Sequence, residues 1–117
     1  MNASLLEIRA FTSWVTKIFT DDEYSVFQHY LKENPQAGTV MPGCGGLRKI
    51  RFSDPKRGKG KRGGVRIIYY HIPEVRWIYL IYGYDKDEAD DLTPDQKKVF
   101  ASLAKTLKEE ALQNNPK

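Results

Sequence analysis

The 117-residue chain is poor in histidine and cysteine and has no long apolar run. Its one cysteine, Cys44, excludes an intramolecular disulfide. Two histidines and one cysteine do not make a zinc motif, so we expect neither a metal site nor a cofactor. The start of the chain lacks the pattern of a secretory signal, and no apolar stretch approaches the roughly 20 residues of a spanning helix. These absences predict a cytoplasmic protein that does not bind membranes.

The sequence also lacks internal repeats and low-complexity linkers, and its length is that of one domain. We therefore expect a single domain over residues 1–117, with a frayed tail at 112–117. Hydrophobic residues make up 40% of the chain, enough for a modest core, and this excludes intrinsically disordered and collagen-like classes.

Helical and strand patterns divide the chain. A short strand is expected within residues 4–11 and a helix over 12–19. Thr20 and Glu23 match a capping box at the start of a helix over 21–33, and Thr93 and Gln96, with Pro94 at the first helical position, begin a final helix. Between them, β-branched and aromatic runs at 47–53, 63–72 and 74–84 predict a three-stranded meander. The fold class is α+β, with N-terminal helices and a C-terminal helix on a mostly antiparallel sheet of three to four strands.

The net charge of +4 is unevenly distributed along the chain. Residues 44–66 contain nine basic side chains and one acidic one, a net charge of +8, so the rest of the chain carries −4. Such a concentration favours a polyanion as partner, through counterion release and electrostatic steering. Six acidic residues lie between Asp85 and Asp95, just before the final helix, where they serve solvation and the helix dipole more readily than metal binding.

The glycine-rich run at 58–64 resembles a phosphate-binding loop only superficially. No strand-to-helix transition and no Lys-Ser/Thr pair follows it, so it is not a Walker motif. Nucleoside triphosphates are therefore not expected ligands.

The remaining candidates for a reactive site are basic side chains and tyrosine hydroxyls. Strand alternation places Lys49 and Arg51 on one face of their strand, and Arg66 lies in the next strand. Tyr82 and Tyr84 share one face of the last strand, so all five side chains could converge. Such a site suits RNA cleavage without metal, in which a 2′-hydroxyl attacks the adjacent phosphate. Arginines would stabilise the phosphoryl charge, and Lys49 or Tyr84 would transfer the proton.

In order along the chain, GGLRKIR, GKGKRGGVRIIYY and IYLIYGYDKDEADDLTPDQ resemble the RelE/HigB superfamily of toxins from type II toxin-antitoxin systems. Within it, the GKGKRGG stretch before an arginine-bearing strand is similar to the HigB-like branch. The resemblance runs from about residue 45 to residue 107. It implies a RelE-like fold and a ribosome-dependent mRNA endonuclease that enters the ribosomal A site and cuts the bound message. It also implies a cognate helix-turn-helix antitoxin, through which alone the toxin would contact operator DNA.

The resemblance also implies site residues. Near the end of the last strand Asp85 stands where some members have an arginine. The implied catalytic residues are Lys49, Arg51, Arg66, Tyr82, Tyr84 and Lys86. The implied RNA-binding residues are Arg48, Lys56, Arg57, Lys59, Lys61 and Arg62.

Two other functions remain open at this point. A toxin of the related ParE type shares the fold but poisons DNA gyrase; the alternating cations on the strand and the basic loop favour phosphate contacts instead. A non-enzymatic nucleic-acid-binding module fits the charge distribution equally well, and would bind without cutting.

Overall fold

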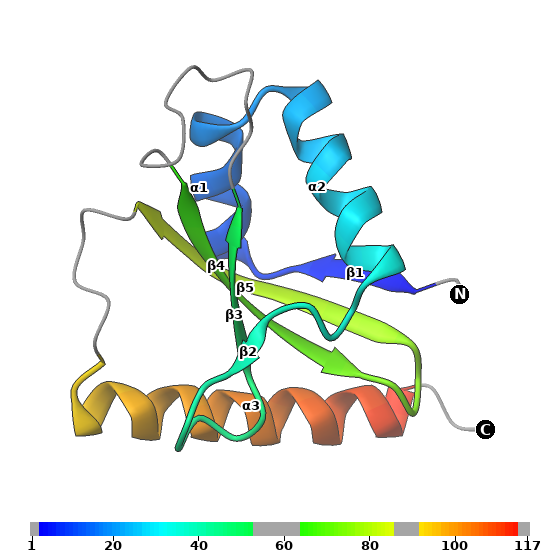
Figure 1. Ribbon diagram of the computed structural model, residues 1–117. Helices are drawn as coiled ribbons and strands as arrows, with labels where there is room; N and C mark the ends of the chain where they lie inside the picture. The colour runs from blue at the N-terminus through cyan, green and yellow to red at the C-terminus, as the bar shows by residue number, and fades with distance from the viewer. Residues whose placement is uncertain (1–2, 53–63, 86–91, 115–117) are drawn as a thin grey trace.

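The computed structural model describes residues 3–52, 64–85 and 92–114. A five-stranded sheet lies between two helical layers (Figure 1). Strands β3 (Arg48–Phe52), β4 (Val65–Ile72) and β5 (Trp77–Asp85) form the expected antiparallel meander. Strand β1 (Ser4–Glu7) pairs parallel with β5, and β2 (Thr39–Val40) pairs antiparallel with β3, giving the order β1-β5-β4-β3-β2. The α+β class is confirmed, and the sheet has five strands where three to four were expected.

The edge strand β2 accounts for that difference. β2 has two residues, too few for an alternating pattern that a sequence could show. The first strand is shorter than predicted, because helix α1 (Arg9–Ile18) begins within the expected strand over 4–11.

Helix α2 (Asp21–Glu33) has the predicted limits, and both hydrogen bonds of the Thr20/Glu23 capping box form. Helix α3 (Pro94–Asn114) begins with the same motif: the Gln96 N–H donates to Thr93 Oγ1 at 3.1 Å, and the Thr93 N–H donates to Gln96 Oε1 at 2.9 Å. The helix continues to Asn114, so residues 112–114, expected in a frayed tail, are helical.

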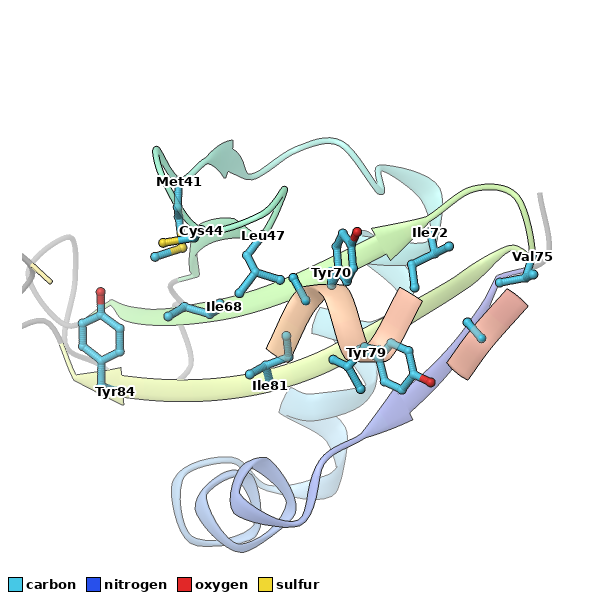
Figure 2. Packing of buried hydrophobic residues seen from close by; sticks show 13 residues of the cluster. Met41, Cys44, Leu47, Ile68, Tyr70, Ile72, Val75, Tyr79, Ile81 and Tyr84 are labelled. Atoms are coloured by element: carbon cyan, nitrogen blue, oxygen red, sulfur yellow. The ribbon is translucent and has the colours of Figure 1, made fainter. Parts of the chain in front are cut away.

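The core is divided by the sheet. On one face Phe11 and Val15 of α1 and Phe27 and Leu31 of α2 cover Ile67 and its neighbours. On the other face α3 and the turn over residues 41–47 cover a second cluster (Figure 2). Because both faces are covered, β4 is buried along almost its whole length, which explains its nearly continuous apolar sequence.

Of the helices in the described part of the chain, none combines the length and apolar character needed to cross a lipid bilayer.

Candidate functional site

Five of the predicted site residues lie on one face of the meander, the face that α3 covers. Arg51 is the cross-strand partner of Arg66, and Arg66 is the partner of Tyr84, so these three form a row across β3, β4 and β5. In the next row on this face, Lys49 is opposite Ile68 and Ile68 is opposite Tyr82. We call Lys49, Arg51, Arg66, Tyr82 and Tyr84 the candidate surface.

A β-bulge in β5 brings the two tyrosines to this face. Tyr69 pairs with Leu80 but Ile68 pairs with Tyr82, so Ile81 is an extra residue in β5. Regular alternation from Tyr79 and Ile81 would turn Tyr82 to the opposite face. With the bulge, the Tyr84 ring joins the core cluster on the α3 side. Figure 2 shows this ring at the end of β5, on the same side of the sheet as Ile81.

The candidate surface has an exposed layer and a buried layer. Arg51 is exposed, Lys49 is half-buried, and 44% of Tyr82 is accessible. Arg66 and Tyr84 are buried, with 6% and 5% accessible. The Tyr82 ring centroid lies 6.0 Å from that of Tyr84 and 6.4 Å from that of Phe100 in α3. Arg51, Lys49 and Tyr82 can thus contact a ligand directly, whereas Arg66 and Tyr84 are largely covered.

Arg51 and Arg66 bring two guanidinium groups to neighbouring positions of the sheet. Side chains directly opposite on one face of an antiparallel pair lie about 4.5–5.5 Å apart at Cβ. An anion bound between the two guanidinium groups would accept hydrogen bonds from both. The arrangement is therefore typical of a phosphate site.

Arg48 is directed to the opposite face, because it lies one residue from Lys49 on β3. Its Nη1 donates to the Gly38 carbonyl oxygen at 2.7 Å and to the Gln36 carbonyl oxygen at 3.2 Å. Arg48 was predicted to bind RNA; in the structure it holds the loop that leads into β2, and it is not part of the candidate surface.

Tyr69 also holds the loop that leads into β2. Its hydroxyl accepts from the Gly38 N–H at 2.9 Å and donates to the Pro35 carbonyl oxygen at 2.8 Å. Burial raises the pKa of this phenol, which keeps it protonated as the donor. A Cβ at Gly38 would lie 2.8 Å from the Tyr69 ring, so only glycine fits there. No sequence motif predicted this contact, although a tyrosine in a buried strand signals that its hydroxyl needs a partner.

Some predicted residues lie outside the described part of the chain. They are Lys86 and the loop cations Lys56, Arg57, Lys59, Lys61 and Arg62. Within residues 3–52, 64–85 and 92–114, no three or more His, Cys, Asp or Glu side chains gather as a metal site would require.

Comparisons with solved structures and with protein families each give a match. A crystal structure of the isolated RelE toxin of E. coli matches with a TM-score of 0.48 and 18% sequence identity, over 91% of this chain and 99% of that one. Residues 37–115 match the family described as "RelE toxin of RelE / RelB toxin-antitoxin system". This match spans well over half of the 117 residues and includes the whole candidate surface. The chain belongs to the RelE toxin family of toxin-antitoxin systems.

Proposed function

We propose that the protein is a ribosome-dependent endoribonuclease of the HigB-like branch, which cuts mRNA in the ribosomal A site and is held inactive by a cognate helix-turn-helix antitoxin. The observation that carries the proposal is the row Arg51, Arg66 and Tyr84, with Lys49 and Tyr82 beside it on the same face. Two guanidinium groups can stabilise phosphoryl charge and an amine or a phenol can transfer a proton, so this set of side chains supports cleavage by a 2′-hydroxyl.

In the proposed reaction the 2′-hydroxyl of one nucleotide attacks the phosphorus that follows it. The bond from phosphorus to the 5′-oxygen of the next nucleotide breaks, leaving a 2′,3′-cyclic phosphate and a 5′-hydroxyl. One proton leaves the attacking oxygen and one must reach the departing oxygen. Arg51 and Arg66 stabilise the charge that develops on the phosphoryl oxygens.

Proton transfer is assigned to Lys49 or Tyr84, as the sequence suggested, with Lys86 as a further candidate. Tyr82, with 44% of its surface accessible, would stack on a base beside the scissile phosphate. Lys56, Arg57, Lys59, Lys61 and Arg62 would hold the RNA backbone through their charge. Arg48 would act indirectly, by fixing the loop beside β3.

Induced expression in a bacterium, with mapping of mRNA ends, tests this function. We expect growth arrest and new mRNA ends within reading frames. Arg66→Lys keeps the buried charge but loses the planar fork of donors, so it should reduce cutting. Growth arrest with intact mRNA and stabilised gyrase–DNA cleavage complexes would instead indicate a ParE-type toxin. RNA binding with neither cutting nor arrest would indicate a non-enzymatic module.

A further inference from the structure

A cavity of about 350 Å³ lies beside the candidate surface, between β2, the turn that follows it and the start of α3. Lys49 belongs to both the cavity and the candidate surface. The described lining residues are Thr39, Val40, Met41, Pro42, Cys44, Lys49, Leu92 and Lys97. The cavity thus opens next to the place where the scissile phosphate is proposed to lie.

The walls of the cavity combine apolar side chains with a few polar groups. Met41 and Leu92 supply apolar contact, and Thr39, the cross-strand partner of Lys49, supplies a hydroxyl that can donate and accept. The volume is at the low end of the range of about 300–1,000 Å³ for small-ligand sites, and fits one nucleotide better than a longer segment. Lys49 and Lys97 add positive charge to the lining.

Lys97 is not explained by the stability of its own helix. It lies in the first turn of α3, where its N–H donates to the Thr93 carbonyl oxygen at 3.0 Å. A cation in the first turn opposes the helix dipole and costs stability. Its Cδ lies 3.7 Å from the position that a Cβ would take at Gly43, so the stem packs along the turn after β2 while its end reaches the cavity.

We propose that this cavity binds one unstacked base of single-stranded RNA, next to the phosphate held by Arg51 and Arg66, and that it sets the nucleotide preference of cleavage. Sequence-specific RNA recognition targets single-stranded bases that are splayed out and hydrogen-bonded at their edges. Met41 and Leu92 supply apolar contact to the base, Thr39 the edge contact, and Lys97 a contact to the flanking phosphate. The inference rests on the proposed function, because it takes its ligand from that reaction.

A binding assay without ribosomes tests the inference. The probe is a trinucleotide that cannot be cleaved, because it carries 2′-deoxyribose at the cut position. Three further probes are the same trinucleotide with one of its three bases removed. We expect one of the three base deletions to weaken binding selectively, and binding to shift the amide resonances of Thr39, Val40 and Cys44. Thr39→Val should then change the relative affinities for the four bases at that position.

Lys97→Ala has a matched control in Lys98→Ala, since the neighbouring Lys98 is exposed and does not line the cavity. Loss of one phosphate contact to a single strand should lower the slope of log affinity against log salt by about 0.7 in Lys97→Ala. Lys98→Ala should keep the wild-type slope.

Equal binding of all base-deleted probes, equal slopes in the two variants, or no binding by the wild type would overturn the inference. If the proposed function is wrong but the inference is right, the protein will bind the trinucleotide selectively at the cavity and will leave mRNA on ribosomes uncut. If the trinucleotide bound without base selectivity and the antitoxin displaced it, the cavity would be assigned to the antitoxin. That result would also overturn the inference.

Discussion

Replacing Arg51 with glutamine should separate activity from stability. Arg51 is exposed and directly opposite Arg66 on the same face of the sheet. Arg51→Gln removes one charge but keeps a polar side chain at an exposed strand position. If the two arginines are placed for an anionic substrate and not for folding, the variant should lose cleavage without losing stability.

The expected size of each effect follows from the geometry. Cross-strand pairs contribute roughly 0.2–1 kcal/mol, so the free energy of unfolding of Arg51→Gln should stay within about 1 kcal/mol of the wild type. For a domain of this size 1 kcal/mol corresponds to about 4 °C in Tm, so the Tm should stay within roughly 4 °C of the wild type. Loss of one donor to developing charge should lower the cleavage rate by about 10²–10³-fold.

The assay measures thermal unfolding and the rate of mRNA cleavage for the wild type, Arg51→Gln and Arg9→Gln. Arg9 is also an exposed arginine, at the start of α1 on the other side of the sheet, so it controls for loss of one positive charge. Arg9→Gln should retain cleavage. Full activity in Arg51→Gln, or a fall in Tm that parallels the loss of activity, would refute the reasoning.

Three further predictions concern the frame that holds the site. Tyr69→Phe removes both hydroxyl bonds and leaves the Gly38 N–H without its acceptor, so unfolding in denaturant should show a loss of about 1–3 kcal/mol. Gly83→Ala should reduce soluble expression and Tm, because a Cβ there would lie 2.2 Å from the Trp14 ring. Burial, followed by the charge of Arg48, lowers the pKa of His71 from 6.5, with Glu74 opposing. The unfolded chain therefore protonates His71 more readily than the folded chain does, and the free energy of unfolding should fall as pH drops below about 6.5. Unfolding scans of His71→Gln should show a weaker dependence on pH.

Each of these has a result that would contradict it. Unchanged stability of Tyr69→Phe would show that the loop before β2 does not depend on the hydroxyl. A Gly83→Ala variant with the wild-type Tm would mean that α1 does not pack closely on β5. An equal loss of stability in acid for the wild type and His71→Gln would assign the effect to other groups.

Local sequence signals predicted much of the fold. The capping boxes at Thr20 and Thr93 fixed the starts of α2 and α3, because side-chain hydrogen bonds at a helix end depend only on residues three apart. Alternation identified β3, β4 and β5. The two-residue β2 and the early start of α1 were missed, because pairing with a distant strand and tertiary packing decided both.

The candidate site was predictable in composition but not in geometry. Alternation placed Lys49 and Arg51 on one face, yet no local pattern showed that the extra residue Ile81 turns Tyr82 and Tyr84 to that same face. The sequence also could not distinguish Arg48, which holds a loop, from Arg51, which is exposed. Cross-strand register makes that distinction, and register depends on the whole sheet.

The most direct test of the central claim is the chemistry of RNA ends made by purified protein on ribosomes carrying a defined mRNA. The account predicts one cut in the A-site codon, ending in a 2′,3′-cyclic phosphate and a 5′-hydroxyl, and strongly reduced in Arg51→Gln. Intact mRNA, or cleavage that persists at the wild-type rate in Arg51→Gln, would contradict the claim that this surface cuts RNA.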